Sequence, residues 1–353
     1  MNQDFKKFST KILEGFPQRN KEVVLRRFGL AESQEMETLE SIGRDHKITR
    51  ERVRQIENDT LKKLKERVSS PKFAPAFKEL EGSMSAVLEQ HGGVMKEASL
   101  LGKLVPEGNK NFAYFVLSLS PSFKRMDLDG CFYPVWTNNQ SAVDTAKKMC
   151  QTFEEKMKAL KKTLSEQEIA DIYEKELKPQ MKKEMSNEAV LSYLGICSRL
   201  AKTVDQKWGL SAWAEVNPKT IKDKIEMVLK RENKPLHFQD ISRLIEDLNA
   251  RLANVKKLSP HIQTVHNELI KNNSFILVGR GMYALKDWGY EPGQVKDIIS
   301  KVLKDSLAPL TKEEIIQAVS NQRSVKESTI LSSLRNKNLF TKDASGKYQV
   351  REA

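Results

Sequence analysis

The chain has 353 residues, of which 39% are hydrophobic and 30% are charged, and its formal net charge at pH 7 is +13. The modest hydrophobic share favours several small helical domains over one large core, because small domains have more surface per residue. The basic balance indicates a polyanionic partner such as nucleic acid, although ribosomal and membrane-surface proteins share it. No apolar run approaches the roughly 18–20 residues that span a bilayer, and the N-terminus lacks the apolar core of a signal peptide. We therefore expect a cytoplasmic protein.

Catalysis and metal binding find no support in the sequence motifs. There is no Gly-x-x-x-x-Gly-Lys-Ser/Thr loop, no Gly-x-Ser-x-Gly elbow and no His-Glu-x-x-His motif. The cysteines Cys131, Cys150 and Cys197 are odd in number and far apart, which fits neither a disulfide framework nor a zinc spacing. We expect a protein that is not an enzyme and has no cofactor or metal. The motif search does not exclude a nuclease-like cluster of residues that come together only in the folded chain.

The most specific stretch runs from Thr38 to Glu57 and predicts two short helices joined by a tight turn. Thr38 and Thr49 each precede an apolar-periodic run, where a hydroxyl can accept a hydrogen bond from a free amide of the first helical turn. Leu39 and Ile42 give the first helix its buried side. In the second helix, four apolar side chains project within roughly 140° of arc; they are Val53, Ile56, Leu61 and Leu64.

The opposite face of the second helix carries polar side chains that suit base edges. They are Glu51, Arg54, Gln55, Asn58 and Lys62, with Arg50 at the flank of the first turn. Arginine can pair with guanine, glutamine with adenine, and glutamate can accept from cytosine in the major groove. Such residues near a helix N-terminus are typical of a helix-turn-helix recognition helix. The alternative interpretation is a solvated charged face, the commoner meaning of such a run.

The order of these residues resembles region four of the primary-type, bacterial sigma factors. The resemblance covers about residues 12–68 and is most specific across Thr49-Arg50-Glu51-Arg52-Val53-Arg54-Gln55-Ile56-Glu57. It implies that the upstream promoter element is read by Arg50, Glu51, Arg54 and Gln55. The residues expected near DNA phosphates are Thr38, Arg44, Lys47, Thr49, Arg52, Asn58 and Lys62. In that family, region four also binds the flap of RNA polymerase.

Two departures from the family pattern concern the turn and the first helix. His46-Lys47 stands where the family usually has an aromatic or aliphatic residue and glycine, which puts the angle between the helices in doubt. The insert Ala31–Glu37 is acidic and could shift the first helix. Only about a dozen residues precede the match, which leaves no room for the promoter-melting domain of sigma factors. We therefore do not expect the chain to initiate transcription alone.

After a linker-type break at Ser69–Pro75, the chain contains a repeated sequence pattern. Leu164–Ile169, Leu236–Ile241 and Leu310–Ile315 share a pattern of Leu, a capping or polar residue, two variable positions, an acid and Ile. They start 72 and 74 residues apart, and a weaker copy begins at Val94. Each copy lies between amphipathic helices, which favours a repeated structural unit.

Each repeat closes in a short aromatic pair of strands around a turn, which is a hairpin signal. The closings are Phe123–Trp136, Lys202–Trp213, Phe275–Trp288 and Phe340–Val350, of which the second lacks a turn glycine. Three helices followed by a two-stranded wing is the winged-helix plan. We predict a mainly helical chain with a helix-turn-helix domain at residues 1–70 and tandem winged helices at residues 75–137, 142–214, 218–288 and 293–353.

The third unit resembles the HARE-HTH family over roughly residues 218–290. The resemblance rests on Lys234-Pro235-Leu236-His237-Phe238-x-x-Ile241 and on the closing Gly279-Arg280-Gly281-x-Tyr283-x-Leu285-x-x-Trp288. That family includes the N-terminal domain of the RNA polymerase delta subunit and modules of chromatin and restriction proteins. The resemblance implies a winged helix attached to DNA-associated machinery, whether through DNA or through protein. The fourth unit looks like a degenerate relative.

Several single residues have a functional and a plainer interpretation. Arg280, at the expected wing tip, can enter a minor groove, but an arginine on an exposed turn more often serves solubility. Aromatic side chains at strand spacing can stack on bases but more often close a small core; they are Trp136, Trp213, Tyr283 and Trp288. The histidines lack a ligand cluster and favour capping or surface roles; they are His237, His261 and His266. The lysine-rich helix Lys147–Lys162 predicts a solvated face above one apolar side, formed by Met149, Phe153, Met157 and Leu160.

Two hypotheses of function remain. The first is a sigma-like, sequence-specific transcription regulator that binds double-stranded promoter-like DNA and associates with RNA polymerase core. The second is a delta-like polymerase accessory subunit without its own sequence specificity. Both place the protein at the nucleoid, with no membrane contact. Both leave open its oligomeric state and the choice between activation and repression.

Overall fold

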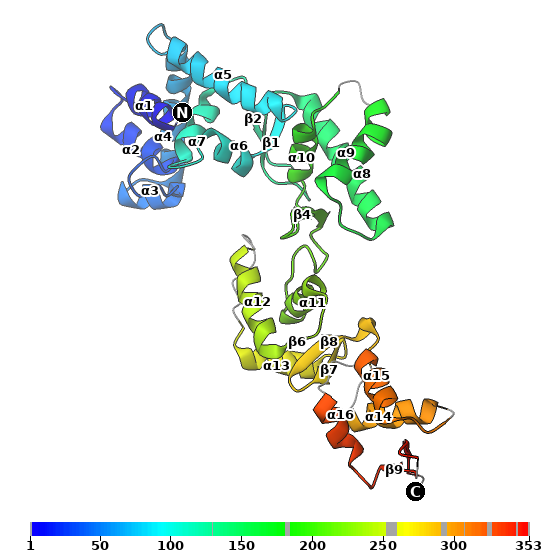
Figure 1. The fold of residues 1–353 in the computed structure, drawn as a ribbon. Coiled ribbons are helices and arrows are strands. Elements are labelled where there is room, and N and C mark those ends of the chain that lie inside the picture. Colours follow the sequence, from blue (N-terminus) through cyan, green and yellow to red (C-terminus); the bar gives the residue numbers. More distant parts are fainter. Residues whose placement is uncertain are drawn as a thin grey trace. The chain divides into compact units, whose positions relative to one another are not determined.

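The computed structural model describes residues 2–128, 130–180, 184–251, 260–290, 295–306, 308–322, 327–343 and 345–351. The chain divides into two compact units, Met1–Ser211 and Ala212–Ala353. The described residues are mainly helical, and their short strands are antiparallel (Figure 1).

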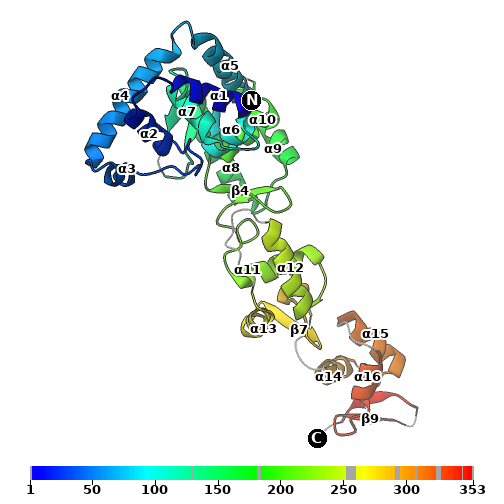
Figure 2. The ribbon, with the colours of Figure 1, turned by 90° about the vertical axis from the view of Figure 1, so that its left-hand side faces the viewer.

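Four helices open the first unit: α1 (Asn2–Ile12), α2 (Gln18–Arg27), α3 (Leu39–Asp45) and α4 (Arg50–Val68). The Thr38 hydroxyl accepts from the amide of Ser41, and the Thr49 hydroxyl accepts from the amide of Arg52, so both predicted N-caps are confirmed. The long helix α4 has α2 and α3 beside it (Figure 2). A small core holds these three helices together; its buried residues are Val23, Ile42, Val53 and Ile56.

A second segment of the first unit consists of α5 (Ala74–Gln90), β1 (Val94–Lys96), α6 (Glu97–Leu104), α7 (Asn111–Leu119), β2 (Lys124–Met126) and β3 (Val135–Thr137). The strands form one antiparallel sheet in the order β1-β3-β2. The linker predicted at Ser69–Pro75 needs correction. The chain does break between α4 and α5 there, but Phe73 is buried and packs against Phe8 and, like Phe77, belongs to one shared core. That core extends from Phe5 to Trp136.

The third segment consists of α8 (Gln140–Leu160), α9 (Glu166–Ile172), the π-helical turn η1 (Tyr173–Leu177), the 3₁₀ turn η2 (Lys178–Gln180), α10 (Asn187–Gly195), β4 (Leu200–Lys202) and β5 (Trp208–Leu210). The hairpin β4–β5 forms although it lacks a turn glycine, because Gln206 adopts the left-handed conformation with φ +61°. The predicted apolar side of α8 is confirmed for Met149, Phe153 and Met157. It is wrong for Leu160, the last residue of the helix, which is half exposed.

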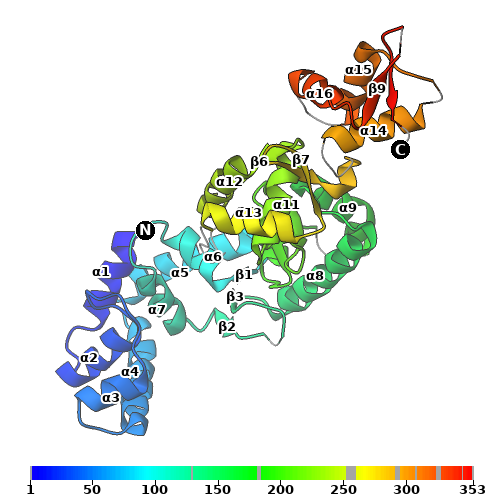
Figure 3. The ribbon, with the colours of Figure 1, turned by 90° about the horizontal axis from the view of Figure 1, so that it is seen from below.

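The second unit begins with α11 (Ile221–Glu232), β6 (Leu236–His237), α12 (Phe238–Arg251), α13 (Ile262–Lys271), β7 (Phe275–Gly279), β8 (Met282–Leu285) and η3 (Lys286–Trp288). It ends with α14 (Val295–Asp305), α15 (Lys312–Gln322), α16 (Glu327–Leu334), β9 (Phe340–Lys342) and β10 (Tyr348–Val350). Figure 3 shows α11 and α13 beside the strands of this unit, where α11 is in contact with β8 and α13 with β7. The strand order β6-β8-β7 matches that of β1-β3-β2.

The repeated sequence pattern has a structural cause. Its leading leucine pairs with the closing hairpin of its own unit: Leu164 with Trp208, Leu236 with Tyr283 and Leu310 with Tyr348. The next residue caps the following helix, as Ser165 does with the acid Glu168 in a capping box. Hydrogen bonds from Lys162 and from the backbone of Ser165 lower the pKa of Glu168 to about 2. The final isoleucine is buried, at Ile169, Ile241 and Ile315. The predicted fold class, a helix-turn-helix followed by units of three helices and a hairpin, is therefore confirmed.

The aromatic residues at strand spacing that are buried serve to close a small core, which is the plainer of the two interpretations. Trp136 is 3% exposed and donates through Nε1 to Glu97 Oε2 at 2.9 Å, and Tyr283 is 4% exposed. Trp288 is half-buried and packs against Ile276, Val278 and Ala284. Trp213 is half-buried in the turn after β5. Asp129, within the first predicted closing Phe123–Trp136, lies outside the described residues.

Candidate nucleic-acid interface

The turn between α3 and α4 is fixed by the backbone. Lys47 adopts the left-handed conformation with φ +55°, at the position where glycine is usual, and the amide of Ile48 donates to the carbonyl oxygen of Gly43 at 2.9 Å. A Cβ atom on Gly43 would lie 2.8 Å from the Ile48 carbonyl oxygen, so only glycine allows this close approach. The departure at His46-Lys47 is thus accommodated by a lysine in a glycine-like conformation.

The residues predicted to contact bases lie together on the N-terminal half of α4. Arg50, Glu51, Arg54 and Gln55 are all exposed there. Glu51 accepts two hydrogen bonds from Arg54, at 2.7 and 2.9 Å, and Gln55 Oε1 accepts from Arg52 at 3.0 Å. The contact with Arg54 lowers the pKa of the Glu51 carboxyl and raises the pKa of the Arg54 guanidinium. Both side chains therefore present permanent charge to the solvent.

The predicted phosphate contacts divide into two groups. Thr38 and Thr49 use their hydroxyl oxygens to cap α3 and α4. Each hydroxyl can still donate its hydrogen to a phosphate. The others are exposed side chains on α3, on the turn or on α4, namely Arg44, Lys47, Arg52, Asn58 and Lys62.

Arg26 on α2 holds α3 in place behind these residues. Its guanidinium donates to both carboxylate oxygens of Glu37, at 2.7 and 2.6 Å, and also contacts Asp45 at the other end of α3. Glu37 also accepts from the Ser41 hydroxyl at 3.0 Å. These hydrogen bonds hold the pKa of Glu37 below its ordinary value and raise that of Arg26. The end of the acidic insert Ala31–Glu37 is therefore anchored to α2, a role that the sequence interpretation missed.

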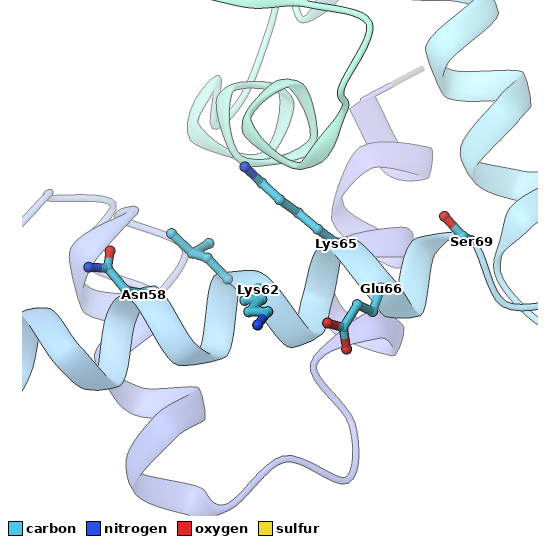
Figure 4. A pocket seen from close by; sticks show the side chains of 6 residues that line it. Asn58, Lys62, Lys65, Glu66 and Ser69 are labelled. Atoms are coloured by element: carbon cyan, nitrogen blue, oxygen red, sulfur yellow. The ribbon is translucent and has the colours of Figure 1, made fainter.

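A shallow groove lies on the C-terminal half of α4. It is lined by Asn58, Leu61, Lys62, Lys65, Glu66 and Ser69. Asn58, Lys62 and Lys65 project from successive turns of the helix (Figure 4). Lys65 lies 11 residues after Arg54, which is three helical turns and therefore the same side of α4. The sequence interpretation missed Lys65, although its spacing from Arg54 and Asn58 is a signal for it.

The remaining candidates lie in the second unit. Arg280 is exposed at the turn between β7 and β8, as expected for a wing tip. His261 caps α13 by accepting from the Gln263 amide, and His237 accepts from that of Gln239, which agrees with the predicted capping roles. Within the described part of the chain, His, Cys, Asp and Glu side chains form no group of three that would hold a metal ion. Each described helix is too short or too polar to cross a membrane.

Comparison with known proteins finds sequence similarity in the N-terminal segment. Residues 12–66 match the family model of sigma-70, region 4. Over 65 residues, the chain is 43% identical to the RNA polymerase sigma factor RpoD from each of two strains of Helicobacter pylori. This match covers 18% of the chain and 10% of each sigma factor. Residues 12–66 therefore carry a helix-turn-helix of the sigma-70 region 4 type, while the rest of the chain lies outside this similarity.

Proposed function

We propose that the chain is a DNA-binding transcription regulator that reads a promoter-type element through α4 and associates with RNA polymerase core. The observation that carries the proposal is the exposed group Arg50, Glu51, Arg54 and Gln55 on the first two turns of a doubly capped helix-turn-helix. Their side-chain types match the hydrogen-bonding edges of the major groove. Lys62 and Lys65 then lie along the flanking phosphates. Phosphate contacts supply most of the affinity, and base contacts select the site.

The contact between Glu51 and Arg54 is compatible with base reading. Arg54 uses Nε and one terminal nitrogen toward the carboxylate, and a guanidinium has five N–H donors in all. Its remaining donors can pair with guanine while the carboxylate fixes the orientation of the side chain. Because fewer rotamers must then be immobilised on binding, such a pre-ordered pair favours affinity and specificity together.

Selection of binding sites from random duplex DNA tests the proposal. Arg54→Ala is expected to relax the preference at one base pair by about 1–3 kcal/mol. Lys63→Ala is the matched control, because Lys63 is an exposed cation on the opposite side of the same helix. It should leave the selected sequence unchanged. Identical selected motifs for the Arg54 variant and the parent chain would contradict base reading by α4.

A second candidate function is a polymerase-bound accessory subunit without sequence specificity. It is favoured by exposed apolar side chains in the second unit: Ile262 and Ile270 on α13 are 45% and 65% exposed, and Leu277 on β7 is 47% exposed. Exposed apolar side chains that form a contiguous patch are typical of protein-binding surfaces. Two results would favour this candidate. The chain with alanine at Arg50, Arg54 and Gln55 would still capture polymerase core, and its DNA footprint would be the same as that of the parent chain.

A further inference from the structure

The third helix of the second segment, α7, is a core helix. Its sequence, Asn-Phe-Ala-Tyr-Phe-Val-Leu-Ser-Leu, is apolar on nearly all sides, and each of its nine residues is buried or half-buried. A helix that is hydrophobic all round belongs inside a protein. In helix-turn-helix folds, by contrast, the helix that closes the three-helix group is the one that enters the major groove and exposes polar side chains.

The surface that covers α7 belongs to the segment formed by α1–α4, which contains the match to sigma-70, region 4, and is here named the sigma-like segment. The ring of Phe28, which follows α2, packs against the rings of Tyr114 and Phe115 at centroid distances of 6.0 and 5.2 Å. The side-chain amides of Asn109 and Asn111 both donate to the carbonyl oxygen of Gly29, at 3.0 and 3.1 Å. The apolar and polar contacts together attach α7 to the end of α2.

Gly29 is adapted to this contact. Its φ is +62°, and a Cβ atom built on it would lie 2.4 Å from Asn111 Nδ2. Any side chain at this position would therefore strain the backbone and also push Asn111 away. The sigma-like segment thus has a glycine at the point where the next segment docks.

The third helix of the third segment, α10, docks onto the second segment in a similar way. Tyr193 donates through its hydroxyl to the carbonyl oxygen of Gly92 at 2.7 Å. Gly92 has φ +82°, and a Cβ atom there would lie 2.7 Å from the Tyr193 ring. Near the start of α10, Glu188 accepts from Gln90 at 2.7 Å. Tyr193 is 3% exposed, and this burial raises its pKa to about 12.

The hairpin loop of the second segment closes the same junction. The amide of Tyr133 donates to the Ile196 carbonyl oxygen at 2.9 Å, and the amide of Ser198 donates to that of Cys131 at 2.7 Å. This loop would be the wing tip of a DNA-binding winged helix. Here its backbone hydrogen bonds are made with the chain just after α10. In the second segment, both elements that a winged helix offers to DNA, the third helix and the hairpin loop, are therefore engaged within the chain.

We propose that α7 and α10 are internal docking helices, which join the first three segments into one rigid body that contacts DNA bases through α4 alone. The inference rests on the proposed function for the role of α4, but the docking itself does not depend on DNA. It assigns the second and third segments to support of the helix-turn-helix. It also closes the apolar face of the sigma-like segment to outside proteins, because α7 occupies that face.

Hydrogen exchange on the full chain, measured free and bound to a selected duplex, tests the proposal. The amides of α7 and α10 are expected to exchange slowly in the free protein and to stay unchanged when DNA binds, whereas those around α4 gain protection. Fast exchange in free α7 or α10, with protection gained on DNA, would overturn the proposal. Docked helices together with no DNA-dependent protection of α4 would instead count against the proposed function only.

Two matched pairs of glycine variants sharpen the test. Gly29→Ala and Gly92→Ala add a Cβ atom against Asn111 or Tyr193, whereas Gly15→Ala and Gly130→Ala impose a similar backbone strain, at φ +79° and +77°, with nothing within 4 Å. Exchange in α7 and in α10 should accelerate about tenfold more in the docking variants than in their controls. Equal effects within each pair would contradict docking at these glycines.

A milder variant distinguishes the loss of one docking contact from general unfolding. Tyr193→Phe removes only the hydroxyl that donates to Gly92. It should accelerate exchange in α10 and leave α1–α4 unchanged, with the same selected DNA motif as the parent chain. A changed motif would show that α10 takes part in base reading and would overturn the assignment.

Discussion

Helices α4 and α13 each close a group of three helices, but their exposed faces differ in chemistry. The exposed face of α4 carries charged and amide side chains, among them Arg50, Arg54 and Gln55. The exposed face of α13 combines Ile262 and Ile270 with amides and a single lysine. Similar helical frames thus carry surfaces suited to different partners, because function depends on the side chains presented rather than on the frame.

The largest expected effect is on the free energy of unfolding, which a buried substitution beside α4 should lower far more than an exposed one on α13. Ile42→Ala empties part of the small core between α2, α3 and α4, where Ile42 is fully buried, and should reduce the free energy of unfolding by about 2–5 kcal/mol. Ile270→Ala, at a 65% exposed position, should change it by less than about 0.5 kcal/mol. Chemical denaturation of the full chain, followed segment by segment through hydrogen exchange, gives both values; equal losses would contradict the assigned burial.

The next effect concerns pH and the anchoring of α3. Hydrogen bonds from Arg26 lower the pKa of Glu37 in the folded protein. The ionised carboxylate therefore contributes stability above its ordinary pKa of about 4.5, and this stability is lost as the pH falls through the lowered folded value. Glu37→Gln should cost about 1–2 kcal/mol at pH 7 and flatten the loss of stability below pH 4.5. An unaltered acid profile in this variant would show that the contact does not anchor the segment.

A slightly smaller effect is expected from the cap of α4. Thr49→Ala removes the hydroxyl that accepts from the Arg52 amide at 3.2 Å and should cost about 1 kcal/mol. Thr49→Asn, which preserves a capping group, should recover most of this stability. Thermal unfolding measured for both variants checks the cap, and equal destabilisation by the two would contradict it.

The smallest effect is on salt dependence. Lys65→Ala should lower affinity evenly across DNA sequences and reduce the slope of log affinity against log salt by about 0.9, as one phosphate contact is lost. Lys271→Ala, on the exposed face of α13, is the control and should leave the slope unchanged if the phosphate contacts are confined to α3, α4 and the turn between them. A slope that falls equally in both variants would make α13 a second phosphate-binding helix.

Local features of this chain were predictable from its sequence. The caps Thr38 and Thr49 and most of the buried side of α4 follow from helix periodicity within a few residues, but Leu61 is only half-buried and lines the groove. The repeat beginning at Leu164 was visible because a strand-paired leucine, a helix cap and a buried isoleucine recur at fixed spacing. These signals depend only on neighbouring positions.

Contacts between distant positions were not predictable in this way. Phe28 and Phe115 are 87 residues apart, and their contact depends on how α7 meets the end of α2. The sequence interpretation did not identify α7, and the apolar sequence of this helix does not specify its partner. Likewise, nothing local shows that Arg26 holds Glu37. The sequence pattern suggested a linker at Ser69–Pro75, because it could not show that Phe73 enters a core shared by two segments.

The most direct test of the central claim, sequence-specific DNA binding through α4, is genome-wide occupancy of the tagged full chain compared with that of RNA polymerase. The claim predicts occupancy at promoters that share an upstream motif, and loss of this occupancy in the Arg54→Ala variant. A signal that follows polymerase through transcribed genes and survives Arg54→Ala would contradict it.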